Sequence, residues 1–347
     1  MKRRLVDYLC EHGTSERFAL MTTEESDEVL SGTLRSVSGR EYSIQDGIPS
    51  FVAGSEMQRE QKDTVDSFSW KWDYAKNYRE NTQSHYVQWY LDRYGFGTRE
   101  ALGVFLASKK MVLDAGTAHG RDAEMYASAG TAEVFGVDIS SGIRLAYRDL
   151  AGRDNVHLLQ ADLMRLPFPQ GMFDFIACDQ VLHHTPDTYA GLRALLSHLA
   201  TGGHIAFYVY RVKGPIREFC DDYIRERTVR MSPDECLKFA ESMTRLGKAL
   251  SDLNVVVDVP EAVPLLGIEA GPQDVQRFIY WNVFKCYWND TMDWESNVIT
   301  NFDWYHPLHA HRHTREEVLQ WCETEGLEIE HMDVQESGIS VLARKRS

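Results

Sequence analysis

Three aspartates stand at or just after the ends of short apolar runs, a pattern that can bring carboxylates to one ligand site. They are Asp114, Asp138 and Asp162, which follow or close the runs Met111–Asp114, Glu133–Val137 and Val156–Gln160. Such runs alternate with helix-length amphipathic segments, which predicts βαβ units and a parallel sheet. The carboxyl ends of parallel strands meet at one edge of the sheet, where ligands bind. There Asp138 can accept two hydrogen bonds from a ribose diol, and Asp162 can receive the exocyclic amine of an adenine ring.

A turn of small residues follows the first run, because residues 112–121 read VLDAGTAHGR. Only small residues let the backbone come close to a ligand at such a turn. Asp138 stands 24 residues after Asp114, which suits a ribose-binding acid. A tight turn without a ligand is the alternative, because the pattern departs from G-x-G-x-x-G. A dehydrogenase is disfavoured, since a dinucleotide pyrophosphate needs room for an anion at the helix start, whereas two aspartates flank this turn.

Two further strands are expected before the alternation breaks, at Phe173–Cys178 and His204–Tyr210. We therefore place the ligand-binding core at residues 108–213. Residues 214–303 then carry charged helical stretches and aromatic clusters, which indicates a helical lid or insertion after the fifth strand.

The C-terminal residues 304–347 are expected to complete the core with a helix and a β-hairpin. Thr314 begins a capping box, and Gly326 suits the C-terminal cap of the helix. The hairpin strands are Leu327–Val334 and Ile339–Arg344. The sequence thus predicts an α/β fold whose sheet is mostly parallel and ends in an antiparallel hairpin.

Taken in order, the motifs resemble those of class I S-adenosylmethionine-dependent methyltransferases. The similarity covers about Met111–Tyr210, and the motifs that carry it are Asp114-Ala115-Gly116 with Gly120, Asp138-Ile139-Ser140, Ala161-Asp162-Leu163, Leu166-Pro167-Phe168, Phe173-Asp174, Val181-Leu182-His183-His184 and Thr201-Gly202-Gly203. The resemblance implies a Rossmann-like methyltransferase sheet, S-adenosyl-L-methionine as the cofactor, and transfer of its methyl group to an acceptor.

The resemblance also implies roles for single residues. The turn of Asp114, Ala115, Gly116, Thr117, Ala118 and Gly120 passes the methionine portion, Asp138 and Ile139 hold the ribose, Asp162 and Leu163 frame the adenine, and Asp179 lies near the methionine amino group. One departure is Ala118, where the family usually has glycine. A methyl group fits there if φ stays negative, so we expect cofactor binding to be weakened rather than abolished.

A second resemblance concerns residues 1–54. Gly39–Pro49 is similar to the end of the small zinc-ribbon module that precedes some bacterial methyltransferase domains. Such modules usually carry two C-x-x-C pairs, whereas here the first is reduced to Cys10 and the second reads Arg35-Ser36-Val37-Ser38. One thiolate cannot hold a zinc ion that needs about four ligands. A small β-ribbon module without metal ligands is therefore expected.

An aromatic-rich helical cap is expected at residues 55–107. Its segment Phe68–Trp72 resembles an aromatic segment of the same fused proteins. The resemblance favours a helix folded over the cofactor, with Trp72 as a contact. The alternative is a stripe of core residues along a helix.

Methyl transfer requires the nucleophile to be aligned with the methyl carbon and, for a hydroxyl, relieved of its proton. Histidine is the usual base. The candidates are His183 and His184, which follow the fourth strand, and His306 and His309, with Tyr305 beside them as a pocket residue. Residues 303–314 read DWYHPLHAHRHT, and two alternatives remain for them: a polar loop that leads to the Thr314 cap, and a metal site built from alternate histidines. The assignment that we favour contains no metal.

The insertion carries Trp281, Tyr287, Trp288 and Trp294. We expect it to close over the acceptor together with the histidine loop, so that acceptor choice resides there. The same aromatic residues would equally suit a dimer surface.

Composition narrows the partners. Lys plus Arg number 37 and Asp plus Glu number 52, a net charge of −15 that repels nucleic acid. No apolar run approaches the ~20 residues of a membrane span, and the cysteines lie far apart, which indicates reduced thiols. We expect a cytoplasmic monomer or homodimer that binds neither nucleic acid nor membrane.

The function predicted from the sequence is therefore an S-adenosylmethionine-dependent methyltransferase of a small-molecule acceptor. Methylation of oxygen is preferred, because several candidate bases are present. The alternatives are a methyltransferase of a glycan or lipid-linked precursor, and a non-catalytic module that only binds the cofactor.

Overall fold

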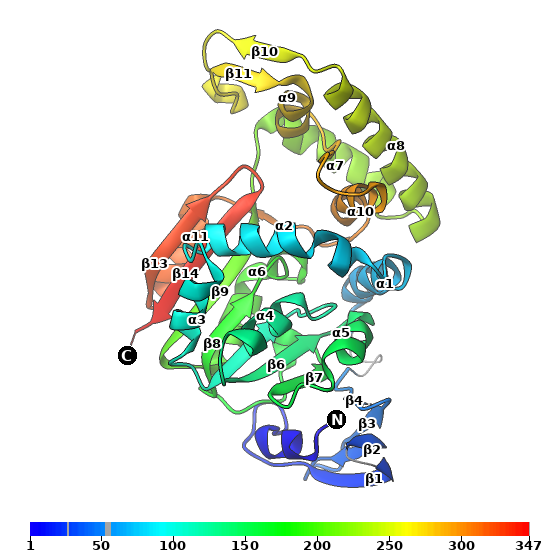
Figure 1. The fold of residues 1–347 in the computed structure, drawn as a ribbon, viewed down its shortest axis with the longest axis vertical. Coiled ribbons are helices and arrows are strands. Elements are labelled where there is room, and N and C mark those ends of the chain that lie inside the picture. The colour runs from blue at the N-terminus through cyan, green and yellow to red at the C-terminus, as the bar shows by residue number, and fades with distance from the viewer. Residues whose placement is uncertain (26–27, 53–56, 347) are drawn as a thin grey trace.

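The centre of the protein is one mixed sheet, shown in Figure 1 by a computed structural model that describes residues 1–25, 28–52 and 57–346. The strands lie in the order β13-β14-β9-β8-β5-β6-β7. Their bounds are β5 (Met111–Ala115), β6 (Glu133–Asp138), β7 (Val156–Gln160), β8 (Phe173–Cys178), β9 (Leu199–Arg211), β13 (Leu327–Val334) and β14 (Gly338–Lys345). Strands β5 to β9 run parallel, and β14 pairs antiparallel with β9 and β13. The predicted α/β fold, with its mostly parallel sheet and C-terminal antiparallel hairpin, is confirmed.

Side chains alternate along the strands and bury both faces of the sheet. Val112 and Phe175 pack on one face against four helices, whereas Leu113 and Ile176 pack on the other against two helices and the N-terminal segment. The first set is α2 (Tyr78–Arg93), α3 (Arg99–Leu106), α4 (Arg121–Ala129) and α5 (Gly142–Leu150), and the second is α6 (Thr188–His198) and α11 (Arg315–Thr324). Single turns of 3₁₀ helix, η2 (Leu163–Arg165) and η3 (Leu182–His184), follow β7 and β8.

The N-terminal segment forms its own antiparallel sheet, in the order β1-β2-β3-β4, against the lower end of the core (Figure 1). It contains η1 (Arg3–Tyr8), β1 (Ala19–Glu25), β2 (Val29–Arg35), β3 (Glu41–Gln45) and β4 (Ile48–Pro49). Asp46 and Gly47 both have positive φ, 50° and 76°, as a two-residue hairpin turn requires. The boundary expected at residue 54 lies outside the described residues.

Hydrogen bonds join the two loops of this module that the zinc-ribbon resemblance singles out. Ser38 donates from Oγ to Oε1 of Glu11 at 2.7 Å, and the Ser36 and Ser38 hydroxyls lie 2.8 Å apart. Cys10, which directly precedes Glu11 in the sequence, is buried. Within residues 1–25, 28–52 and 57–346, no three His, Cys, Asp or Glu side chains are grouped to hold a metal ion.

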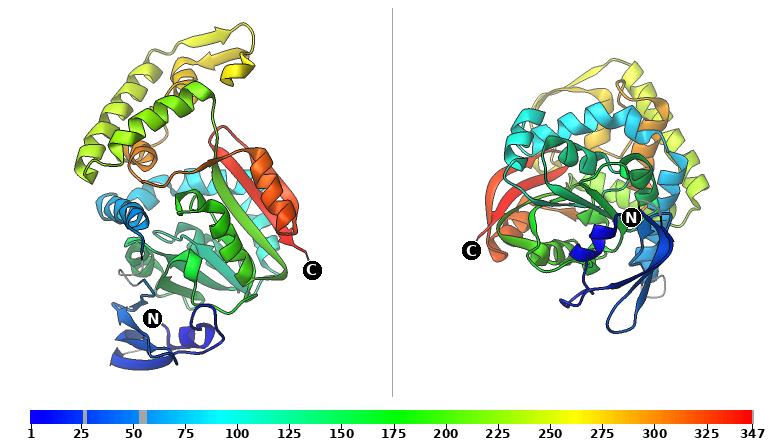
Figure 2. Two further views of the ribbon diagram at one scale, coloured as in Figure 1. Left: turned by 180° about the vertical axis from the view of Figure 1, so that it is seen from behind. Right: turned by 60° about the horizontal axis from the view of Figure 1, so that its bottom comes forward.

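Two segments lie above the carboxyl edge of the sheet. The first is α1 (Arg59–Tyr74) with α2, and the second contains α7 (Pro215–Thr228), α8 (Pro233–Asp252), β10 (Val256–Val259), η4 (Pro264–Leu266), β11 (Gly271–Asp274), α9 (Val275–Asn282) and α10 (Trp294–Tyr305). Figures 1 and 2 show α7, α8 and the β10–β11 hairpin extending away from the core, while α10 turns back toward α1 and α2. Trp70 of α1 packs on Phe302 of α10 with ring centroids 4.9 Å apart.

The chain returns to the core through the short strand β12 (Arg312–His313), which pairs parallel with β9. The capping box is formed as expected, because the Thr314 amide donates to Glu317 at 2.7 Å and the Glu317 amide donates back to the Thr314 hydroxyl at 3.2 Å. Gly326 follows the helix with φ at 65°. No helix in the described part of the chain is both long and apolar enough to cross a membrane.

Candidate functional site

One cavity opens at the carboxyl edge of the parallel strands, beneath α1. It is lined by the turns after β5, β6, β7 and β8, by α1 and α2, and by single residues of β9 and α10. The lining residues are Gln61, Thr64, Val65, Phe68, Lys71, Trp72, Tyr78, Tyr86, Gly116, Thr117, Ala118, His119, Arg121, Asp122, Val137, Asp138, Ile139, Ser140, Ala161, Asp162, Leu163, Asp179, Gln180, Val181, His184, Thr185, Pro186, Tyr210 and Asp303.

The turn after β5 comes close to the cavity because Gly116 has φ at 88° and no side chain. A Cβ at this position would meet Val181 Cγ2 at 2.2 Å. The amides of Gly116 and Thr117 both donate to the Val137 carbonyl, at 2.7 and 2.9 Å. The turn is therefore fastened to β6, and its Gly116 cannot be replaced without movement of Val181.

Ala118 takes a left-handed conformation with φ at 47°, so the negative φ that our sequence argument required does not occur. The Ala118 amide donates to Asp138 Oδ2 at 2.8 Å. This bond to a carboxylate offsets the modest cost that a non-glycine residue pays in this region. Ala118 therefore keeps the backbone shape of a glycine turn, because the next strand holds it there.

Asp138 ends β6 and faces the cavity. Its Oδ1 accepts from the Ser140 amide at 2.7 Å and from the Ser140 hydroxyl at 2.5 Å, while Oδ2 accepts from Ala118. Burial raises the pKa of Asp138, and these hydrogen bonds act in the opposite direction. Each carboxylate oxygen has two lone pairs, so Oδ2 keeps capacity for a ligand hydroxyl.

Asp162 caps the turn after β7 and also contacts α1. Its Oδ1 accepts from the Met164 amide at 2.9 Å, and its Oδ2 accepts from Gln61 Nε2 at 2.6 Å. Leu163 and Ile139 lie in the same lining. An adenine amine directed at Asp162 would therefore share that carboxylate with Gln61.

Asp179 follows β8 and is bound by protein donors. Arg93 of α2 forms a buried ion pair with it, and the Tyr94 hydroxyl donates to Oδ1 at 2.9 Å. Arg121 lies 3.7 Å away. The residue thus lies in the lining, as the resemblance implies, and it also fastens α2 to the core.

Three of the predicted cofactor residues do not line the cavity, although they belong to the turn or adjoin it: Asp114, Ala115 and Gly120. Asp114 is buried, and its Oδ2 has no hydrogen-bond partner among the described residues. Burial, with a smaller contribution from Asp122, raises the pKa of Asp114 to about 8. A protonated Asp114 would avoid a buried charge beneath the turn.

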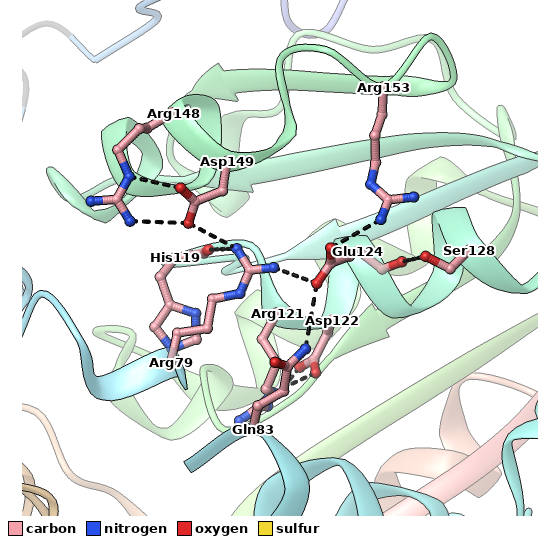
Figure 3. A network of polar contacts seen from close by, with 10 residues as sticks. All are labelled: Arg79, Gln83, His119, Arg121, Asp122, Glu124, Ser128, Arg148, Asp149 and Arg153. Carbon is pink, nitrogen blue, oxygen red and sulfur yellow. Dashed lines mark hydrogen bonds and ion pairs between the residues drawn. The ribbon is translucent and has the colours of Figure 1, made fainter. Parts of the chain in front are cut away.

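A polar network fastens α2 to the same turn (Figure 3). The Arg79 guanidinium donates to the His119 carbonyl at 3.3 Å and to Asp149 at 3.1 Å, and it also pairs with Glu124. Arg153 donates to the other oxygen of Glu124 at 2.9 Å. One arginine of the cap therefore joins the turn, α4 and α5.

Part of the cavity lining is aromatic and contains one ion pair. Phe68, Trp72, Tyr86 and Tyr210 contribute rings, and Lys71 Nζ donates to Asp303 Oδ2 at 2.5 Å. Sequence reasoning named Trp72 but missed Gln61, Lys71, Tyr86, Tyr210 and Asp303. Gln61, Thr64, Phe68 and Lys71 are spaced along α1 so that they share one helical face. This spacing could have revealed Gln61 and Lys71. No local pattern distinguishes Asp303.

Of the predicted histidines, only one lines the cavity, although the rings of His183 and His184 lie 4.3 Å apart. His184 lines the cavity, with Phe68 edge-on at 4.9 Å. His183 is fully buried against Tyr210. His306 lies between the Ser67 hydroxyl at 2.6 Å and the Met231 carbonyl at 3.2 Å, and neither it nor His309 lines the cavity.

His184 has a defined tautomer. Its Nδ1 lies 2.7 Å from the His309 carbonyl, which can only accept, so Nδ1 carries the hydrogen and Nε2 keeps a lone pair. Burial lowers the pKa of His184 to about 3. The imidazole is therefore neutral at physiological pH.

The aromatic residues of the insertion pack within the insertion. Tyr305 donates to the Lys285 carbonyl at 2.7 Å and stacks edge-on with Phe239. Trp281 lies against Tyr280, and Trp288 lies against Trp294. Of the described residues in 214–303, only Asp303 reaches the lining. The expected aromatic lid is therefore not formed by these side chains, because the insertion uses them for its own core.

Comparison with known proteins places residues 113–207 in a family described as "Methyltransferase domain". The 27-O-demethylrifamycin SV methyltransferase of Amycolatopsis mediterranei is 33% identical over 99 residues, 27% of this chain and 36% of that protein. The demethylmenaquinone methyltransferase of Staphylococcus saprophyticus is 32% identical over 105 residues, 30% of this chain and 45% of that protein. An S-adenosylmethionine-dependent methyltransferase from Mesorhizobium loti has 17% identity, covers 72% of this chain and 98% of its own, and superposes with a TM-score of 0.40. The matched segments span less than half the length of the two curated relatives.

Proposed function

Because residues 113–207 match a family described as "Methyltransferase domain", we propose that this chain transfers the methyl group of S-adenosylmethionine to an oxygen atom of a small-molecule acceptor. The observation that carries the proposal is one cavity whose lining combines two kinds of side chain. The carboxylates Asp138 and Asp162 line it together with the Gly116 turn, and Phe68 and Tyr210 contribute aromatic rings.

The carboxylates and the Gly116 turn fit the cofactor. Its ribose hydroxyls and amines are hydrogen-bond donors, and carboxylates are acceptors for such groups. Asp138 Oδ2 keeps capacity to accept, and Gly116 leaves the turn without a side chain toward Val181. When bound, the cofactor supplies an electrophilic methyl group on a sulfonium.

The aromatic part of the lining suits an aromatic or otherwise apolar acceptor. Phe68 and Tyr210 belong to it, and such rings bury planar apolar ligands well. The two named relatives act on small molecules according to their names. These names support a small-molecule acceptor for this chain.

His184 is the histidine that we assign to acceptor contact. Its Nε2 keeps a lone pair, because Nδ1 donates to the His309 carbonyl, and it can accept a hydrogen bond from an acceptor hydroxyl. With a pKa of about 3, the ring takes up a proton weakly near neutral pH. Its contribution is then chiefly to orient the hydroxyl.

The test combines cofactor binding and methyl transfer. Titration calorimetry with S-adenosylhomocysteine should give a defined dissociation constant, and Asp138→Ala should weaken it by ~1.5–3 kcal/mol, the usual value of hydrogen bonds to a charged group. Methyl transfer is followed with methyl-labelled cofactor and two aromatic hydroxyl probes, catechol and 1,4-naphthohydroquinone. Unchanged affinity in the variant would remove Asp138 from the ribose site, and transfer to neither probe would contradict an aromatic hydroxyl acceptor.

A further inference from the structure

One carboxylate of the cavity lining, that of Asp303, has a hydrogen-bond partner at only one of its two oxygens. Asp303 lies in the last turn of α10, and its Oδ2 accepts from Lys71 Nζ at 2.5 Å. Its Oδ1 is buried and has no hydrogen-bond partner among the described residues. Both residues line the cavity. Leaving a buried acceptor atom without a hydrogen bond is unfavourable, so a donor that enters the cavity would be stabilised there.

Several titratable side chains surround Asp303, and two of them bond to each other. Its charge acts on Tyr78, Tyr86, Tyr210 and Lys285, and it pairs with Lys71. The Tyr78 and Tyr86 hydroxyls lie 2.8 Å from each other and form one hydrogen bond. Burial raises the pKa of Tyr86 to about 12, so this pair remains protonated near neutral pH.

We propose that Asp303 is a catalytic residue that accepts the proton of the acceptor's nucleophilic hydroxyl at Oδ1, while Lys71 holds Oδ2. This inference rests on the function proposed above. A lone pair of the hydroxyl oxygen forms the bond to the methyl carbon as the carbon–sulfur bond breaks, and the electron pair of that bond stays on sulfur. The hydroxyl proton passes to Asp303. The products are a methyl ether, a neutral thioether and a carboxylic acid, so charge and atoms balance.

A carboxylate suits this step better than the neighbouring histidine. Protonation of His184 would place a second cation in the field of Lys71 and Arg225, both of which oppose it. A carboxylate that takes up the proton becomes neutral, so no further cation is created beside Lys71. Lys71 keeps the side chain in place, because its ammonium also lies 4.1 Å from the centre of the Trp72 ring. The acceptor class that follows is a neutral hydroxyl compound rather than a carboxylate.

The role also explains why an otherwise distant insertion touches the site. Asp303 is the point at which α10 meets α1, and Phe302 beside it packs on Trp70. The insertion thereby presents one chemical group to the cavity, while Phe302 joins it to the cap. A purely structural ion pair between α1 and α10 is the competing explanation.

The experiment compares Asp303→Asn with Asp222→Asn. Asp222 of α7 forms an ion pair with Arg312 at the same 2.5 Å but lies outside the cavity. We expect Asp303→Asn to lower kcat for catechol or 1,4-naphthohydroquinone by ~10²–10⁴-fold, the scale of general-base catalysis. The affinity for S-adenosylhomocysteine should stay within about threefold of wild type. Asp222→Asn should keep both the rate and the affinity.

The outcomes separate the two proposals. If Asp303→Asn keeps the wild-type rate and only its thermal midpoint falls, the ion pair is structural and our assignment is wrong. If Asp303→Asn also loses cofactor affinity by more than about tenfold, Asp303 acts at the cofactor and the assignment is again wrong. Wild-type protein that binds S-adenosylhomocysteine but methylates neither probe overturns the hydroxyl acceptor and, with it, the role of Asp303.

Discussion

The cap helices α1 and α2 and the insertion at residues 214–303 are both rich in aromatic side chains, yet they use them differently. The cap directs Phe68, Trp72 and Tyr86 into the cavity. The insertion buries Tyr280 among its own aromatic residues and reaches the cavity through Asp303. In the cap, α2 shares the core of the sheet through Tyr90 and Leu91, and Trp72 of α1 packs on His119 and Gly142. The insertion extends away from the sheet, so it must bury its own apolar surface to stay folded. Aromatic content therefore does not identify a lid, whereas contact with the sheet does.

The largest expected effect distinguishes these two uses directly. Trp72 and Trp288 are equally buried, at 7% and 8% exposure. Replacing either with Ala should cost ~3–5 kcal/mol of stability through the cavity left behind. Only Trp72→Ala should also weaken binding of S-adenosylhomocysteine, because Trp72 packs on Gly142 and His119 beside the Asp138 turn.

Thermal unfolding and calorimetry on the same two variants provide the measurement. Trp288→Ala is the matched control, since it removes the same ring from the insertion. Equal losses of cofactor affinity in both variants would contradict this expectation, because the insertion would then support cofactor binding as much as the cap does.

A smaller effect is expected where α2 is fastened to the turn. Arg79→Met should destabilise the protein by ~1.5–3 kcal/mol, because it removes hydrogen bonds to two carboxylates and the His119 carbonyl. It should also weaken cofactor binding, since the turn loses one of its anchors. Arg148 is the control: it contacts the same Asp149 but is about half exposed, so Arg148→Met should cost only ~0–1 kcal/mol. Chemical denaturation measures both, and similar losses would show that the network in Figure 3 has no special strength.

Much of the core could be predicted because each signal was local. Apolar runs placed β5 to β8 to within a residue, and Thr314 with Glu317 formed the expected capping box. The start of β9 at Leu199 was missed, since Thr201-Gly202-Gly203 looks like a turn and the strand passes through it. The order of acids and glycines predicted the turn after β5 as a cofactor contact, but it did not predict the positive φ of Ala118.

The aromatic part of the cavity lining and its ion pair could not be predicted, because the residues come from α1, β9 and α10, which are distant in the sequence. Lys71 and Asp303 meet through the packing of α1 on α10, a contact between residues far apart in the chain. The histidine cluster misled for the opposite reason. Its spacing suggested one shared site, but His306 turns toward Ser67 and His313 toward Thr188, while only His309 and His311 stack on each other.

The next prediction tests that reinterpretation of the histidine loop. His306→Ala combined with His309→Ala should leave turnover close to wild type, because neither side chain lines the cavity. Stability should fall by about 1 kcal/mol for each hydrogen bond lost, chiefly the one between His306 and Ser67. Ser67→Ala is the matched variant, since it removes the same bond from the α1 side. A loss of turnover by ~10²-fold or more in the double variant alone would restore a catalytic role for the loop.

The smallest expected effect concerns His184, where the cap and the returning loop meet: Phe68 of α1 lies against its ring, and the His309 carbonyl accepts from its Nδ1. Its pKa is about 3 because of burial, below the 6.5 of an unfolded chain. The unfolded state therefore binds the additional proton, so the stability present above pH 6.5 is lost as the pH falls. Between about pH 7.5 and about pH 6 the loss from this residue should be about 0.8 kcal/mol. His184→Gln should reduce the fall in unfolding free energy over that range by this amount, as measured by denaturant titration at each pH. An identical slope in the variant and the wild type would mean that His184 titrates as in the unfolded chain, and that the junction of cap and loop leaves it open to solvent.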